Sequence, residues 1–304
     1  MGTPAFALPS LRILIERGYE ISAIVTTPDK PRGRGLEVSF TPIKEYALSN
    51  SISLFQPDHL GEPQFIDTLR SLSPDLIVVV AFRILPKAVY SISKFGAINL
   101  HASLLPKYRG AAPINWAIMK GEQETGVTTF FLQEAVDTGS IVLQARLRIG
   151  ENETAGELHD TLSEVGAEIV LQTVRLIELG KASPRPQEHS NASPAPKIFK
   201  ADCRIRWKDT ALKIHNFVRG LSPYPTAWTT QAHRTLKVYR TRLVDGQSST
   251  GVAGKVIFCD GSSLLIATGD SSIAILEIQQ EGRKRMSIEE FLRGTQISVG
   301  EQFA

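Results

Sequence analysis

The chain has 304 residues, 42% of them hydrophobic and 21% charged, which suits two ordinary domains with apolar cores. Its two cysteines, Cys203 and Cys259, exclude a disulfide framework and fit a reducing cytoplasm. No apolar run approaches the roughly 18–20 residues of a membrane span. The net charge is +3, yet residues 200–304 hold 15 Lys and Arg against 10 Asp and Glu, whereas residues 1–199 hold 19 against 21. The basic second part fits either a solvated surface or a footprint for a polyanion.

Hydrophobic patterning predicts alternating helices and strands over the first part of the chain. The continuous apolar run at 75–81 is typical of a parallel strand that is covered on both faces. The polar segment 27–40, rich in Gly and Pro, indicates a mobile loop. Predicted strands lie at 20–25, 75–81, 97–101, 125–131 and 141–149, and predicted helices at 3–18, 44–49, 63–72, 86–93, 113–120 and 155–179.

Composition divides the chain at a Pro-rich stretch. We expect a domain at 1–182, a linker at 183–202 with four prolines from Pro184 to Pro196, and a second domain at 203–304. The second domain shows one helix near 211–219, followed by short strands separated by Gly and Asp. Many short strands of this kind indicate a small barrel.

The segment from Gly96 to Pro113 carries the chemistry. If 97–101 is extended, Asn99 and His101 share one face and lie about 6.6 Å apart along the strand. Pro106 cannot continue a strand, so the chain leaves the sheet just after His101, at the end where α/β sheets bind ligands. Asp137 follows in a later loop. An amide donor, an imidazole and a carboxylate suit a reaction with a developing oxyanion and a moving proton.

A histidine in an apolar stretch is more often a packed core residue than a catalytic one, and the surrounding motifs decide here. Their ordered set resembles the formyltransferase family that uses 10-formyltetrahydrofolate, and is closest to the branch that formylates methionyl-tRNA. The resemblance covers nearly the whole chain. The motifs are Gly2-Thr-Pro4, Thr27 to Gly35, Asn99-x-His101, Ser103-Leu-Leu-Pro106, Arg109-Gly-Ala-Ala-Pro113, Gly126-Val-Thr128, Asp137-Thr-Gly139 and Leu221 to Trp228.

This resemblance implies a Rossmann-like α/β formyltransferase domain followed by an OB-like β-barrel domain. It implies formyl transfer from the folate cosubstrate to the α-amine of methionine on initiator tRNA, without a metal. Asn99 and His101 would donate hydrogen bonds to the oxyanion, and Asp137 would orient His101 and help to move the proton. The pterin pocket would be lined by Arg83, Ile84, Leu85, Ser103, Leu104, Leu105 and Pro106, and the acceptor stem approached by Lys30, Arg32 and Arg34. We expect a monomer in the cytoplasm that has no membrane partner.

The chain departs from the family pattern at its beginning, where the family has a short hydrophobic strand before Gly2-Thr-Pro4. We expect Met1 to be an internal methionine of a longer reading frame. The alternative is a true truncation, which would leave a central sheet position empty and the chain unstable. Two other functions stay open: formylation of a small amine, such as glycinamide ribonucleotide or an amino sugar, and an inactive RNA-binding relic. A dinucleotide-binding dehydrogenase is disfavoured, because no Gly-x-Gly-x-x-Gly follows an early strand.

Overall fold

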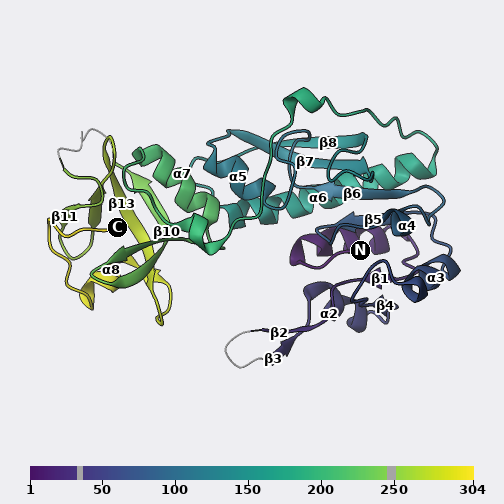
Figure 1. The fold of residues 1–304 in the computed structure, drawn as a ribbon, viewed down its shortest axis with the longest axis horizontal. Coiled ribbons are helices and arrows are strands. Elements are labelled where there is room, and N and C mark those ends of the chain that lie inside the picture. Colours follow the sequence, from purple (N-terminus) through teal and green to yellow (C-terminus); the bar gives the residue numbers. More distant parts are fainter. Residues whose placement is uncertain (33–36, 245–250) are drawn as a thin grey trace. The chain divides into compact units, whose positions relative to one another are not determined.

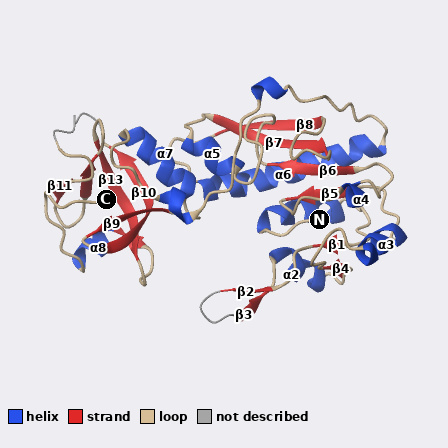
Figure 2. Cartoon of the chain, in the orientation of Figure 1, coloured by secondary structure: helices blue, strands red, loops and turns tan. Residues whose placement is uncertain are grey.

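The computed structural model describes residues 1–32, 37–244 and 251–304, with the backbone alone at 30–39 where it is described. The chain forms two compact units, each assembled from segments that are distant in the sequence. Helices and strands alternate through the first unit, whereas strands dominate the second (Figure 1 and Figure 2). Unit 1 comprises Met1–Gly110, Gly126–Leu147 and His159–Pro194; unit 2 comprises Ala111–Thr125, Arg148–Leu158 and Ala195–Ala304.

Unit 1 is built on a mixed sheet with the strand order β5-β6-β7-β8. Strands β5 (Ile77–Val80) and β6 (Ala97–His101) are parallel, β7 (Glu124–Phe131) is antiparallel to β6, and β8 (Ile141–Arg148) lies beyond β7. Successive residues of β5 and β6 are buried on both faces, as the continuous apolar pattern predicted. The α/β class and the parallel pairing of these two strands are therefore confirmed.

Three helices of unit 1 begin and end within two residues of the prediction, whereas α1 begins five residues later, after a 3-10 turn at Ala5–Ala7, and α4 ends three residues earlier. In α2, Thr41 Oγ1 caps the helix by accepting from the Lys44 backbone N–H at 3.2 Å, and Pro42 occupies the first turn, where its missing N–H costs no bond. Helix α6 ends just before Gly180, which adopts a φ of 62°. The helices are α1 (Leu8–Glu16), α2 (Pro42–Ser49), α3 (Pro63–Ser71), α4 (Lys87–Tyr90) and α6 (Ala155–Glu178).

Met1 and Gly2 occupy a sheet position next to β5. The Met1 amine donates to Val78 O at 2.7 Å, and Gly2 forms a parallel bridge with Val80. On the other side, the Gly2 N–H donates to Val25 O at 3.0 Å, at the end of β1 (Ile24–Val25), which pairs with β4 (Leu54–Phe55). Two residues therefore connect two sheets that would otherwise be separate. Burial lowers the pKa of the Met1 amine to about 5.

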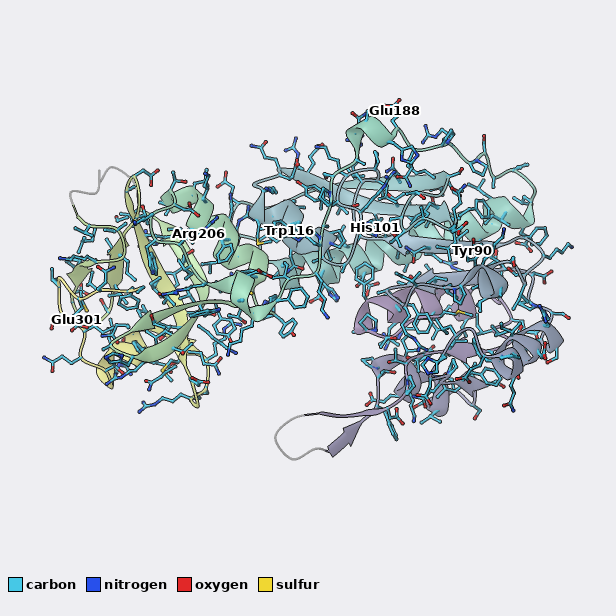
Figure 3. All side chains as sticks on the ribbon, viewed as in Figure 1. Tyr90, His101, Trp116, Glu188, Arg206 and Glu301 are labelled. Atoms are coloured by element: carbon cyan, nitrogen blue, oxygen red, sulfur yellow. The ribbon has the colours of Figure 1, made fainter. Side chains whose placement is uncertain are left out.

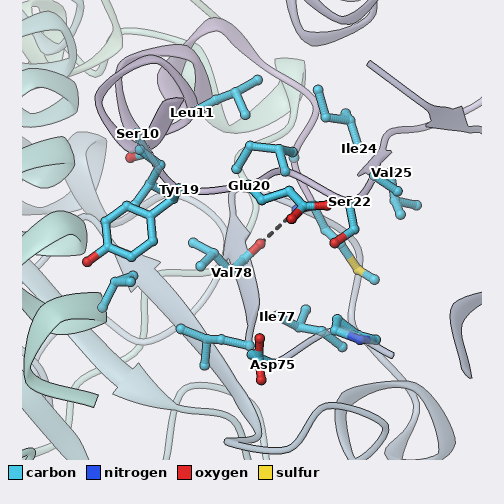
Figure 4. Close-up of a pocket in the computed structure, with 18 of the residues that line it drawn as sticks. Ser10, Leu11, Tyr19, Glu20, Ser22, Ile24, Val25, Asp75, Ile77 and Val78 are labelled. Atoms are coloured by element: carbon cyan, nitrogen blue, oxygen red, sulfur yellow. Dashed lines mark hydrogen bonds between the residues drawn. The ribbon is translucent and has the colours of Figure 1, made fainter. Parts of the chain in front are cut away.

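A cavity of about 620 Å³ continues this sheet position beyond Met1. Its walls include residues 20–24, which run into β1, and residues 74–78, which run into β5 (Figure 4). The strand predicted at 20–25 is shorter in the structure, where only Ile24–Val25 is paired, because residues 20–23 face the cavity instead of a neighbouring strand.

The prediction of a loop at 27–40 is wrong for six of its residues. Strands β2 (Lys30–Arg32) and β3 (Glu37–Ser39) form an antiparallel pair with Lys30 opposite Ser39 and Arg32 opposite Glu37. Two short strands can pair through their backbones whatever their side chains are, so the polar composition gave no sign of them.

Part of the segment predicted as a linker, 183–202, is attached to unit 1. Arg185 and Ile141 exchange two backbone hydrogen bonds of 2.8 Å, which extends the edge at β8 by one bridge. Farther on, Ser193 O accepts from the Arg109 N–H at 2.9 Å. The prolines rule out a regular helix, yet the backbone of this segment is held in place by these bonds.

Unit 2 contains an antiparallel sheet in the order β11-β12-β13-β10-β9, with β14 paired to β13. Residues 302–303 close it into a barrel, because Phe303 bridges Gln231 at the end of β9 and Gln302 bridges Lys255 just before β11. This confirms the predicted small barrel. The strands are β9 (Ala227–Gln231), β10 (Arg234–Leu243), β11 (Val256–Cys259), β12 (Leu264–Ala267), β13 (Ser272–Gln280) and β14 (Met286–Ser287).

Helices α7 (Ala211–Leu221), α8 (Ile288–Arg293) and α5 (Pro113–Met119) complete unit 2. Helix α5 packs closely on α7 at Gly220, where an added Cβ would come within 2.7 Å of Met119 Cγ. Asn115 Nδ2 also donates to Gly220 O at 2.7 Å. Across the described ranges, no helix is both long and apolar enough to cross a membrane.

Candidate active site

Strand β6 presents the two polar residues that the sequence singled out. Asn99 pairs with Val79 of β5, and His101 lies opposite Thr128 of β7 at the strand end. The chain then turns away through Ser103, whose hydroxyl donates to Lys107 O at 2.7 Å. Because the side chains of a strand alternate, Asn99 and His101 lie on the same face, as predicted.

His101 is buried, with 6% of its surface exposed, and each ring nitrogen faces an oxygen. Its Nε2 lies 2.8 Å from Tyr108 O, so this nitrogen carries a proton and donates it to the carbonyl. Its Nδ1 lies 3.7 Å from Asp137 Oδ2, within ion-pair range but longer than a hydrogen bond. Nδ1 is therefore the nitrogen that is left for another partner. Figure 3 labels His101 in the interior of unit 1.

Asp137 is held by backbone geometry and one backbone donor. Its φ of 55° lies in the left-handed region, and its Oδ2 accepts from the Gly110 N–H at 2.8 Å. Two residues later, Gly139 lies so close to β7 that a Cβ would be 1.6 Å from Phe131 O, so only glycine fits there. The turn places the Asp137 carboxylate beside His101, and the predicted pair is brought together.

Asn99 is partly buried, and its side-chain amide has no hydrogen-bond partner among the residues that the structure describes. An unpaired amide on the face of β6 that also carries the buried His101 is a donor available to a ligand. The three groups together can stabilise an oxyanion and relay a proton.

Some of the residues predicted to line a pterin pocket are packed in the core, and others are exposed to solvent. Leu85 and Leu105 belong to apolar clusters of unit 1 and are 8% and 3% exposed, so they also serve the core. Ile84 is 73% exposed. Leu104 is half-buried against Gly126, and Pro106 ends this stretch.

Arg83 is the polar member of this group. Its guanidinium donates to Asp58 O and Pro57 O, both at 2.8 Å, while its buried Nε has no partner among the described residues. A buried unpaired donor of this kind can serve a ligand acceptor.

Two of the three residues predicted to meet RNA lie in the β2–β3 hairpin. Lys30 and Arg32 are the two ends of β2, and Arg34 lies outside the described residues. The hairpin, rather than a loop, carries the first two of these charges.

Sequence reasoning missed three residues that surround the His101–Asp137 pair. Tyr108 supplies the carbonyl for His101, Gly110 supplies the N–H for Asp137, and Gln187 donates to Asp137 O at 2.9 Å. The first two act through their backbones, which leave no side-chain signal in a sequence. Gln187 lies in a Pro-rich stretch, where composition indicated a linker.

Comparisons with known proteins agree on one family. The Formyl transferase family matches residues 2–174, and its C-terminal domain matches residues 197–296. Methionyl-tRNA formyltransferase of Clostridioides difficile (strain 630) is 46% identical over 301 residues, which cover 99% of this chain and 97% of that protein. The enzyme of the same name from Porphyromonas gingivalis (strain ATCC BAA-308 / W83) is 47% identical over 309 residues, covering 98% and 95%.

A solved structure shares the fold at low identity. The sugar 3N-formyl transferase WlaRD, crystallised in the presence of dTDP and 5-N-formyl-THF, superimposes with a TM-score of 0.68 at 20% identity and covers 93% of this chain and 97% of that one. The family match extends over more than half of the chain, and the relatives match it nearly end to end. The chain therefore belongs to the formyl transferase family.

Proposed function

We propose that this chain transfers the formyl group of 10-formyltetrahydrofolate to the α-amine of methionine carried by initiator tRNA. The observation that carries the proposal is the near end-to-end identity, 46% and 47%, with two enzymes named methionyl-tRNA formyltransferase. The geometry around His101 supports the same chemistry, because formyl transfer needs an oxyanion donor and a proton relay.

In the proposed reaction the methionine amine attacks the formyl carbon, a C–N bond forms, and the bond from that carbon to N10 of the folate breaks. The folate supplies the activated formyl carbon. Asn99 donates its unpaired amide hydrogen to the oxyanion of the tetrahedral species. His101 Nδ1, with Asp137 at 3.7 Å to stabilise the cation, takes the proton from the amine and returns it to N10.

We assign the pterin pocket to Arg83, Ile84 and Leu85 together with residues 103–106. The unpaired Arg83 Nε and the exposed Ile84 support this assignment, since a bound heterocycle could accept from one and cover the other. Leu85 and Leu105 then hold the pocket walls from within the core.

We assign tRNA contact to the β2–β3 hairpin and to the barrel. The support is charge: residues 200–304 hold five more basic than acidic side chains, and Lys30, Arg32 and Arg34 lie close together in the chain. Such charges neutralise phosphates and displace their counterions. On this view, residues 1–182 are the catalytic domain and 203–304 the tRNA-binding domain.

A direct assay tests this function. The purified chain is offered 10-formyltetrahydrofolate with charged initiator tRNA or with small amines, including an amino sugar and glycinamide ribonucleotide. We expect formyl transfer to the tRNA-bound methionine only. Turnover of a small amine with none on tRNA would replace this proposal by the small-amine activity.

We predict that the double substitution Arg32→Ala with Arg34→Ala weakens the use of tRNA and spares folate binding. Each lost phosphate contact should reduce the slope of log affinity against log salt by about 1. Steady-state kinetics and filter binding at several salt concentrations measure this.

The matched control replaces Arg17 and Arg70, two exposed arginines of unit 1, and removes the same net charge. An equal loss of tRNA use in that control would show that the effect depends on the net charge alone and not on the position of the arginines. Loss of folate affinity in the hairpin variant would instead assign this segment to the pterin pocket.

A further inference from the structure

Gln187 is a buried amide that uses all of its hydrogen-bonding capacity. It is 6% exposed, and its Nε2 donates to Asp137 O and Gly139 O, both at 2.9 Å. Its Oε1 accepts from Arg109 Nε at 3.1 Å and from Arg109 Nη2 at 2.6 Å. A primary amide has two donor hydrogens and two acceptor lone pairs, so no capacity remains for solvent or ligand. A buried side chain whose hydrogen bonds are all formed holds its partners in one geometry.

The two carbonyls that Gln187 binds flank the turn that presents Asp137. Asp137 adopts a left-handed φ of 55°, a strained conformation for a non-glycine residue that needs support from its surroundings. Inside the turn, Thr138 Oγ1 donates to Ala135 O at 2.8 Å. Gln187 supplies the support from outside the turn, through Asp137 and Gly139.

The second side of Gln187 reaches the same carboxylate by another route. It holds the Arg109 guanidinium, and the next residue, Gly110, donates its N–H to Asp137 Oδ2 at 2.8 Å. One amide therefore fixes both the main chain of Asp137 and the Arg109–Gly110 segment, whose Gly110 N–H binds the Asp137 side chain. These contacts close a ring, and the carboxylate lies 3.7 Å from His101 Nδ1 within it.

We propose that Gln187 is a positioning residue for formyl transfer, which holds the Asp137 carboxylate at the distance where it stabilises the His101 cation. The inference rests on the proposed function of the His101–Asp137 pair. Gln187 touches neither ring nitrogen of His101, so it acts through Asp137. Its place in the Pro-rich segment after α6 gives that segment a role in the reaction.

The sharpest test is Gln187→Glu. A glutamate has nearly the same shape and can still accept from Arg109, but it has no hydrogen to donate to the Asp137 and Gly139 carbonyls. Carboxylate and carbonyl oxygens would then repel each other and shift the turn. Gln187→Met is the second variant, because it removes the donors without adding charge. Gln172→Glu, at an exposed position of α6, is the matched control for the charge change.

We expect Gln187→Glu to lower kcat by about a hundredfold, the loss typical of a catalytic group displaced by 1 Å, with the KM for folate and for tRNA within about threefold of wild type. In an Asp137→Asn background the same substitution should cost less than about threefold, because a residue that acts through another loses its effect once that other is removed. Gln172→Glu should be silent in both backgrounds.

Hydrogen exchange supplies a readout that needs no substrate. Amides of residues 134–140 should exchange faster in both Gln187 variants, while those of β6 stay protected. The proposal is overturned if both folded variants keep full kcat, or if Gln187→Glu costs the same factor with and without Asp137. The activity of the wild type separates failure of this proposal from failure of the proposed function. If the wild type formylates a small amine instead of tRNA-bound methionine, the proposed acceptor is wrong. The Gln187 and Asp137 single and double variants are then compared with that amine as the acceptor.

Discussion

Replacing His101 by alanine is expected to lower turnover by about 10²–10⁴-fold with both substrates saturating, the range that general acid–base catalysis contributes. The physical reason is the paired geometry: Nε2 is anchored on Tyr108 O, and Nδ1 is the nitrogen that can accept a proton beside Asp137. Single-turnover measurement of formyl-methionyl-tRNA formation gives the rate, and circular dichroism shows whether the fold remains.

Asn99→Ala and Asp137→Asn should reduce the same step, and the double variants should lose far less than the product of the single losses. The matched control is His159→Ala, since His159 Nδ1 also lies near a carboxylate, 3.0 Å from Asp160 Oδ1, but is partly exposed on α6. Near-normal turnover in folded His101→Ala would contradict the proposed mechanism. A comparable loss of turnover in His159→Ala would show that the effect is not specific to His101.

An apolar segment of about four residues added before Met1 is expected to raise the thermal midpoint by about 5–10 °C. The cavity of about 620 Å³ beside β5 would take it as a strand between the walls of residues 20–24 and 74–78. Each Val or Ile buried there contributes about 1.5–3 kcal/mol, against about 1–2 kcal/mol for ordering one backbone residue, and the strand pairs its own backbone groups. Calorimetry at pH 8 measures the gain.

The same variant should lose a pH dependence that the buried Met1 amine produces. Burial lowers the pKa of the Met1 amine from 8.0 to about 5, so between these values the unfolded chain binds the proton more tightly than the folded one. Stability therefore rises from pH 5 to pH 8 and falls on acidification, by up to about 4 kcal/mol for three pKa units. His215, whose pKa burial also lowers, adds a smaller slope of the same sign that both chains keep.

A Gly-Ser segment of equal length is the control, since it moves the amine away from Val78 without filling the cavity. It should remove the pH slope and give no gain at pH 8. If the apolar and Gly-Ser variants melt at the same temperature at pH 8, the cavity does not accept a strand.

Strand β6 and its two polar residues were predictable because local rules agreed there. Gly96 precedes the strand, Pro106 prevents its continuation, and the alternation of side chains assigns Asn99 and His101 to one face. The contact between His101 and Asp137 joins residues that are far apart in the sequence. It came from the family resemblance, since strand patterning alone placed Asp137 no more closely than in a later loop.

Features that depend on long-range backbone bonds were not predictable. The hairpin at β2 and β3 needs no apolar alternation, and the closing residues 302–303 are too few to show a period. Gln187 gave no signal, because its partners are carbonyls of Asp137 and Gly139 that any sequence would possess. Composition placed it in a linker, whereas the hydrogen bonds place it beside the candidate site.

The way in which the barrel closes also sets the order in which the two units can fold during synthesis. The bonds that close the sheet come from residues 303 and 304: the Phe303 N–H donates to Gly254 O, and the Ala304 N–H donates to Thr230 O. While residues 300–304 are still inside the ribosome, β9 and β11 remain open edges that can pair with other chains. Every segment of unit 1 lies before residue 195 and emerges earlier. Unit 1 can thus fold before residues 303 and 304, which the barrel needs for closure, have been synthesised.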